Sequence, residues 1–190
     1  MRVKTIITLI FMAFLFVALA GCDEIPQQLI DEATAALDAA KKAEADKYVP
    51  DKFNAAKQAL DRAMAVVQEE ESSTFSNFDE ARNLLTEAKT AADEAAQAVA
   101  AKKEEVRGEA EALIAQIPAA VKAAMDAWRR APRGKGTREA LQQYKAEIEQ
   151  ADAQQAEVKT AMENGDYLTA QKDAQTILKK LQSLQGELKR

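Results

Sequence analysis

Reactive side chains are few in this sequence of 190 residues, which contains no histidine and a single cysteine, Cys22. Without histidine, the chain lacks the imidazole group that commonly serves as general base, proton shuttle or metal ligand. Two clusters of charge are the other candidate sites: the acidic run Glu69-Glu70-Glu71 and the basic stretch 128–138. The available chemistry is therefore that of one thiol and of charged surfaces.

The thiol follows a segment organised like a secretory signal peptide. Arg2 and Lys4 supply positive charge, residues 5–18 are almost wholly apolar, and small residues precede Cys22. The apolar stretch is shorter than the roughly 20 residues that a membrane-spanning helix requires. Residues 1–21 carry two bases and no acids, so their removal leaves 169 residues and changes the formal net charge from −5 to −7. A chain with this charge is not expected to bind nucleic acid.

The run Leu19-Ala20-Gly21-Cys22 closely resembles a bacterial lipobox. The resemblance implies cleavage between Gly21 and Cys22, a diacylglyceryl thioether on Cys22, and a further fatty acid such as palmitate on its amine. Each buried methylene contributes about 0.8 kcal/mol, so two or three chains hold a protein stably on a bilayer. An ordinary signal peptide followed by a chance cysteine is the alternative interpretation.

Asp23, directly after the cysteine, bears on sorting. In lipoproteins of enterobacterial type, Asp at this position resembles the signal for retention at the inner membrane. The resemblance therefore implies a lipid-anchored protein of the bacterial envelope that faces the periplasm or the cell exterior. The inner membrane is favoured if the enterobacterial rule applies.

A basic stretch interrupts the otherwise acidic sequence. Between Trp128 and Arg138 there are five bases and no acid. The candidate residues of this patch are Arg129, Arg130, Arg133, Lys135 and Arg138. Such a patch can bind a phosphate-bearing headgroup, an anionic polymer or an acidic partner. The alternative interpretation, which we prefer, is that these cations only complement the dipole at the C-terminus of a helix.

The sequence predicts no enzyme, no cofactor and no metal site. It contains no Gly-Xaa-Ser-Xaa-Gly elbow, P-loop or metal-ligand spacing. Glu69-Glu70-Glu71 offers the oxygen ligands that hard cations prefer, but three successive acids on a helix point in different directions. A solvated surface is the better interpretation of this run.

Composition and spacing predict an all-α protein. Alanine makes up roughly a fifth of the chain after residue 21, and Lys, Glu, Gln and Leu make up most of the remainder, as is typical of long helices. Apolar spacings of three and four predict five helices. We expect them near 26–46, from Pro50 to about 68, over 79–131 with a bend at Pro118, over 141–162, and over 167–188.

The third predicted helix is about twice as long as its neighbours, which suggests how the five are arranged. We expect an elongated antiparallel bundle in which two three-helix bundles share this long central helix. The predicted divisions are a signal peptide at 1–21, an N-terminal helical bundle at 22–105, and a C-terminal bundle with a heptad hairpin at 106–190.

Residues 25–99 resemble a known domain. The resemblance is carried by Ala40-Lys41-Lys42-Ala43, the segment 48–53 and Phe78-Asp79-Glu80-Ala81. The known domain is an alanine-rich helical domain of unknown function found in bacterial envelope lipoproteins, sometimes ahead of an OmpA-type peptidoglycan-binding domain. This chain stays helical after residue 100, so peptidoglycan binding does not carry over. The resemblance implies no specific activity.

Together these patterns predict a membrane-anchored, non-enzymatic lipoprotein that acts as an envelope scaffold, spacer or protein–protein adaptor. Its expected partners are the bilayer, through acylated Cys22, and an envelope protein or further copies of itself. The alternative is a helical binding module for a peptide or lipid ligand.

Overall fold

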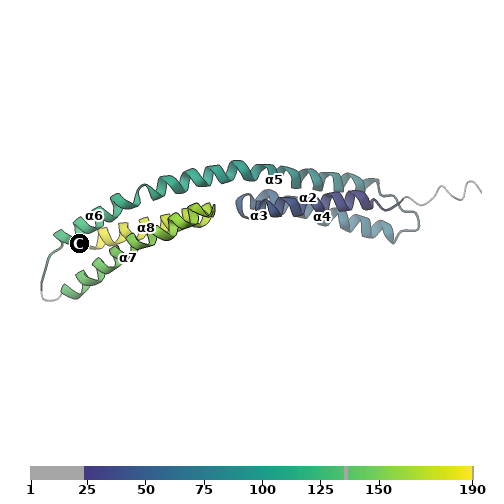
Figure 1. The fold of residues 1–190 in the computed structure, drawn as a ribbon. Helices are drawn as coiled ribbons and strands as arrows, with labels where there is room; N and C mark the ends of the chain where they lie inside the picture. Colours follow the sequence, from purple (N-terminus) through teal and green to yellow (C-terminus); the bar gives the residue numbers. More distant parts are fainter. Residues whose placement is uncertain (1–23, 135–136, 190) are drawn as a thin grey trace, which may run out of the picture. The chain divides into compact units, whose positions relative to one another are not determined.

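The computed structural model describes residues 24–134 and 137–189, and this part of the chain is all α-helical (Figure 1). The predicted fold class, an all-α helical bundle, is confirmed. The helices are α2 (Gln27–Lys42), α3 (Ala45–Tyr48), α4 (Pro50–Glu71), α5 (Asp79–Ile114), α6 (Ile117–Arg130), α7 (Arg138–Glu163) and α8 (Tyr167–Glu187).

The chain divides into two compact units, Met1–Ala100 and Ala101–Arg190. The division falls inside α5, so this one helix contributes to both units. The boundary expected from the sequence, between residues 105 and 106, lies five residues further along the same helix.

In the first unit, α2 and α4 pack against the N-terminal part of α5. Much of this core consists of alanine, which lets helix backbones approach closely. The buried residues are Ala33 of α2, Ala59, Leu60, Ala63 and Val67 of α4, and Phe78, Ala81, Leu85 and Ala88 at and after the start of α5. A smaller cluster continues the same seam with Ala36, Ala56 and Ala92.

One ion pair joins α2 to α5 at the edge of this core, with Lys89 Nζ 2.8 Å from Glu32 Oε2. The hydrogen bond from Lys89 holds the pKa of Glu32 below its ordinary value and raises the pKa of Lys89. Both side chains are more than a third exposed, so the pair contributes little to stability.

The prediction of one helix over 26–46 is wrong near its end. Helix α2 ends at Lys42, and Glu44 adopts the left-handed conformation with φ of 69° before the single turn of α3. This conformation is uncommon for a residue other than glycine. It directs the chain so that Ala45 and Tyr48 are buried. Pro50 then occupies the first turn of α4, as predicted.

The predicted long helix over 79–131, bent near Pro118, is confirmed: it consists of α5 and α6, which meet at a turn over Ala115 and Gln116. Pro118 has no N–H to donate to the carbonyl of Ile114, and its ring would clash with that carbonyl in a continuous helix. The N–H of Gln116 donates to the Leu113 carbonyl at 3.0 Å, and its side-chain amide donates to the Ala112 carbonyl at 3.0 Å. The proline therefore bends the long helix at this turn, which divides it into α5 and α6.

The second unit packs α6, α7 and α8 with the last part of α5. The turn Asn164-Gly165-Asp166 joins α7 to α8 as the predicted hairpin; Gly165 has φ of 75°, and the Asp166 carboxylate accepts a hydrogen bond from the Thr169 N–H. The core here includes larger side chains than that of the first unit. Its buried members include Ala110, Ile117, Ala124, Ile148, Ala151, Val158, Ala174, Ile177, Leu178, Leu181 and Leu184.

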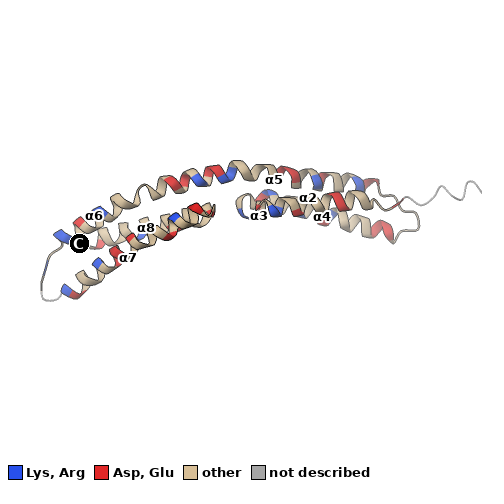
Figure 2. Cartoon of the chain, viewed as in Figure 1, with Lys and Arg blue, Asp and Glu red and all other residues tan. Residues whose placement is uncertain are grey.

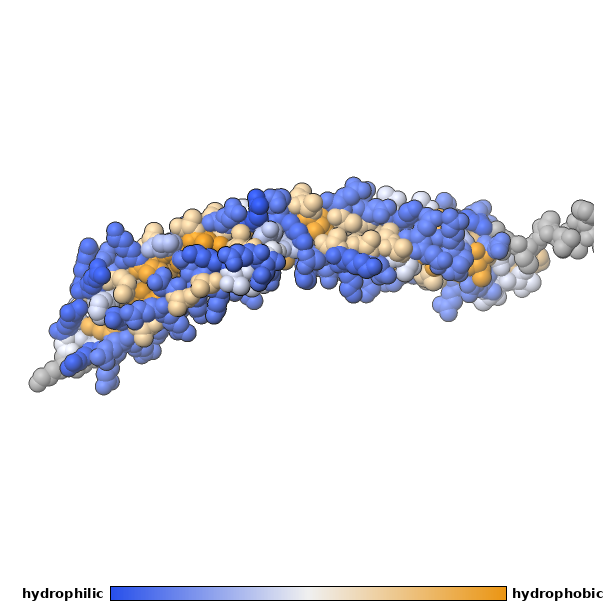
Figure 3. All heavy atoms as spheres, viewed as in Figure 1, coloured by the Kyte–Doolittle hydropathy of each residue, from blue (hydrophilic) through white to orange (hydrophobic). Residues whose placement is uncertain are grey.

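Residues of both charge signs are distributed along the helices (Figure 2). On the face shown in Figure 3, apolar residues lie along the seams between helices and hydrophilic residues flank them. Within the described residues, no polar or charged residue is buried. The cores are therefore held together by apolar packing.

Replacing Ala63 by Leu tests how closely the alanine seam is packed. Ala63 is fully buried, so the added atoms have no room, and we expect the free energy of unfolding to fall by about 1–3 kcal/mol. Ala65→Leu on the exposed face of the same helix is the matched control, expected to change it by less than about 0.5 kcal/mol. Urea unfolding of the full chain measures both; an equal effect at the two positions would contradict close packing.

Candidate functional site

The basic stretch lies where α6 ends and α7 begins. Arg129 and Arg130 form the last turn of α6, and Ala131 leaves the helix in an extended conformation. The loop is tied by Thr137, whose hydroxyl oxygen accepts a hydrogen bond from the Gly134 N–H at 2.8 Å. Because Thr137 is engaged in the loop, α7 begins without a side-chain cap. The positive end of the α7 dipole is thus left without a capping side chain.

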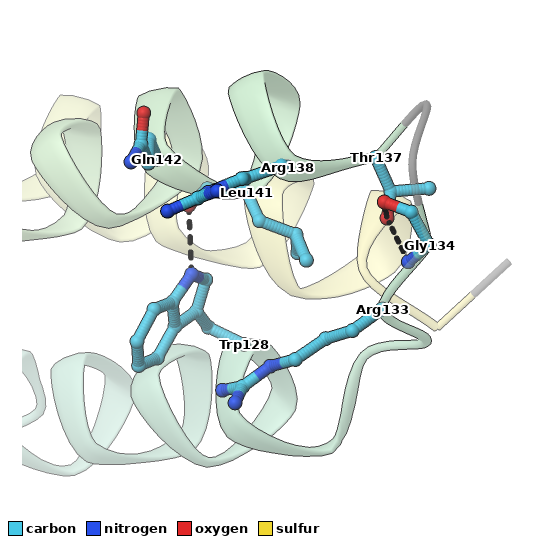
Figure 4. A pocket seen from close by; sticks show the side chains of 7 residues that line it. All are labelled: Trp128, Arg133, Gly134, Thr137, Arg138, Leu141 and Gln142. Atoms are coloured by element: carbon cyan, nitrogen blue, oxygen red, sulfur yellow. Dashed lines mark hydrogen bonds between the residues drawn. The ribbon is translucent and has the colours of Figure 1, made fainter.

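Trp128 connects α6 to α7 at this place. Its indole Nε1 donates a hydrogen bond to the Leu141 carbonyl at 2.7 Å, and its ring packs against the core of the second unit (Figure 4). The structure shows that it also forms a wall of an open pocket.

The pocket has a volume of about 610 Å³ and lies between the end of α6 and the first turns of α7 (Figure 4). It combines an apolar wall with polar and cationic side chains. It is lined by Trp128, Arg133, Gly134, Thr137, Arg138, Leu141 and Gln142. This size and mixed lining suit a ligand, or a protruding side chain of a partner, that has both an apolar and a charged part.

Two cations lie close to the indole ring. The Arg133 guanidinium carbon is 5.5 Å from the ring centroid, and Lys145 Nζ is 5.9 Å from it. Both distances allow a cation–π attraction, which positions these side chains beside the pocket. Lys145 also pairs with Glu149 at 3.2 Å. Lys145 lies outside the basic stretch 128–138, so sequence proximity did not suggest it.

The structure divides the basic patch that the sequence predicts. Arg133 and Arg138 line the Trp128 pocket, whereas Arg130 lines a separate pocket together with Asp126 and Lys189. Arg129 is paired with Asp126, with Nη1 and Oδ1 3.3 Å apart. Lys135 lies outside the described residues. Of the four described members of the predicted set, Arg133 and Arg138 line the same pocket.

Neither Arg133 nor Arg138 forms an ion pair with a carboxylate in the described part of the chain. Their guanidinium groups are donors suited to carboxylate or phosphate oxygens. One turn beyond Leu141, a hydrogen bond with Glu187 raises the pKa of the Tyr144 hydroxyl. The two guanidinium groups beside the pocket favour anion binding.

The predicted lipidation and sorting residues, Gly21, Cys22 and Asp23, lie outside the described residues. The described chain begins at Glu24, whose carbonyl accepts a hydrogen bond from Arg82 Nη2 of α5 at 3.2 Å. Pro26 is buried immediately before α2. Residues 24–26 are therefore held against the first unit.

The acidic run at 69–71 has a structural role. Glu70 Oε2 accepts a hydrogen bond from the Asn77 N–H at 2.8 Å, and the Glu70 carbonyl accepts one from the Ser76 hydroxyl at 3.0 Å. These bonds tie the α4–α5 loop to the end of α4. Within residues 24–134 and 137–189, no group of three or more acidic or cysteine side chains is placed to hold a metal ion.

Among the helices in the described ranges, none has the length and apolarity needed to cross a bilayer. Comparison with protein-family models, with curated proteins and with solved structures found no match to this chain. The resemblance of residues 25–99 to the lipoprotein domain stays a prediction.

Titration with an acidic probe tests the pocket. Trp128 is the single tryptophan, so its fluorescence reports binding of hexaglutamate directly. We expect a saturable change in the unaltered chain and a loss of affinity of about tenfold or more in Arg133→Gln/Arg138→Gln, because two charge-assisted contacts are removed. The control Arg107→Gln/Lys159→Gln makes the same charge change away from the pocket. If both double variants lost affinity for hexaglutamate equally, the attraction would come from the overall charge of the chain and not from the pocket.

Proposed function

We propose that this chain is a membrane-anchored, non-enzymatic lipoprotein of the bacterial envelope that acts as a scaffold or adaptor. The observation that carries the proposal is the single cysteine, which stands at the lipobox position after a signal-like segment. Pro26, buried at the start of the first unit, follows only four residues later, a reach of at most about 14 Å. Acylation of Cys22 would therefore place the first unit at the bilayer surface without a long tether.

The adaptor role rests on the second unit. The described residues bury no polar group that chemistry would need, and their charged groups are mostly paired or exposed on helix surfaces. The pocket beside Trp128 is the one place described above where two unpaired guanidinium groups, an apolar wall and an uncapped helix start coincide. Such a surface suits an acidic segment of an envelope protein. Association with further copies of the chain is the other route to a scaffold.

The second candidate function is that of a binding module for a free ligand, a peptide or a lipid. The volume and mixed lining of the Trp128 pocket favour it over a purely structural spacer. A ligand that binds the folded state raises its thermal stability in proportion to the logarithm of ligand concentration, whereas a spacer does not respond. The hexaglutamate titration distinguishes an open binding surface from an inert one.

Replacement of Cys22 tests the anchor. In a bacterial host fed an alkyne-labelled fatty acid, we expect the unaltered chain to carry the label and to sediment with membranes. Cys22→Ser should lose the label and enter the soluble fraction, because both the thioether and the acylated N-terminus require this cysteine. Asp23→Ser is the matched control: it should keep the label and, in an enterobacterial host, move from the inner to the outer membrane. Membrane sedimentation of Cys22→Ser without label would contradict the proposal.

A further inference from the structure

We propose that the loop 72–77, between α4 and α5, is a second membrane contact of this chain. In this proposal, Phe75 enters the interface of a zwitterionic bilayer beside the lipid anchor. The inference rests on the proposed function, because it takes Cys22 as the anchored residue.

The start of the described chain, at Glu24, and the loop lie at the same end of the first unit. Helix α2 begins there, α4 ends there and α5 begins there, as Figure 1 shows for the purple helix and its two neighbours. The hydrogen bond from Arg82 to the Glu24 carbonyl joins the start of the described chain to the first turn of α5. Cys22 precedes Glu24 by two residues, a reach of about 7 Å. An acyl chain on Cys22 would thus bring this end of the unit to the bilayer.

Apolar side chains are exposed at this end. Phe75 is 84% exposed, the most of any large apolar residue in the described ranges, and Ile25 is 41% exposed. By contrast, Phe78, three residues after Phe75, is 1% exposed and belongs to the core. The core therefore uses one phenylalanine of the loop region and leaves the other in solvent. An aromatic ring in that position gains free energy by entering a lipid interface.

The loop is already shaped for this contact. Ser76 and Asn77 are both hydrogen-bonded to Glu70, and Asn77 Oδ1 accepts from the Asp79 N–H at 2.9 Å. On the other side of Phe75, Ser72 Oγ donates to the Glu69 carbonyl at 2.8 Å. Because both flanks are fixed, insertion of the ring does not require the ends of α4 and α5 to unfold.

Charge identifies the kind of surface. Residues 72–77 carry no charge, so the loop can approach the headgroups without burying an ion. Acids surround its base: Glu69-Glu70-Glu71 at the end of α4, and Asp79 and Glu80 in the first turn of α5. An anionic surface would repel these carboxylates, whereas a zwitterionic surface would not.

A vesicle assay with one alkyl chain isolates the contribution of the loop. The chain from Cys22 onward contains every described residue, and its only thiol can be alkylated with hexadecyl maleimide. A single acyl chain gives marginal, reversible binding, so a second contact changes the partition measurably. Co-sedimentation with phosphatidylcholine vesicles should show about tenfold weaker partition for Phe75→Ser. The control Met64→Ser removes another exposed apolar side chain, 40% exposed on α4, and should leave the partition unchanged.

Each other outcome overturns the proposal. An unchanged partition for Phe75→Ser shows that the loop does not contact lipid, and an equal loss in both variants shows non-specific adhesion. If the unaltered chain self-associates without vesicles and Phe75→Ser does not, a second copy covers the loop instead. Tighter binding when phosphatidylglycerol replaces a part of the vesicle lipid contradicts the charge argument. Because the alkyl chain is attached chemically, failure of Cys22 to be acylated in cells is a separate result that refutes the proposed function alone.

Discussion

The close approach of helices at alanine seams is the constraint on which this structure depends. In the first unit, Ala33, Ala63 and Ala81 come from three different helices and are almost completely buried together. Alanine favours the helix and adds little volume at the seam, so the backbones lie near one another and the core has little room for a ligand. Binding surfaces must therefore lie at the ends of helices and in the loops between them.

Both candidate surfaces follow from this constraint. In the second unit, larger side chains take part in the packing, and Trp128 at the end of α6 forms an open pocket with the first turns of α7. Its indole N–H, held by the Leu141 carbonyl, positions the ring while Arg133 and Arg138 stay without acidic partners in the described part of the chain. In the first unit, the loop that closes α4 onto α5 buries Phe78 and exposes Phe75.

Much of the fold could be predicted from the sequence, because apolar residues spaced three and four positions apart lie on one face of a helix, and that face is buried. The starts of α4 and α8 were marked by Pro50 and by the Asn164-Gly165-Asp166 turn. No residue type in the sequence indicated the turn at Glu44, because glutamate seldom adopts the left-handed conformation that it has here. The basic patch was only partly predictable, because proximity in the sequence does not show which partner each side chain contacts. Arg129 pairs with Asp126, whereas Arg133 lies over the Trp128 ring.

We propose that a lipid-anchored chain binds an acidic envelope partner at the pocket beside Trp128. The most direct measurement is photo-crosslinking in intact cells from a photoreactive residue at Gln142, which lines the pocket, and from one at Gln150, which is exposed further along α7. We expect one heterologous envelope protein to be captured from position 142 and not from position 150, and we expect Arg133→Gln/Arg138→Gln to abolish its capture. Self-adducts alone, or the same adducts from both positions, would contradict it.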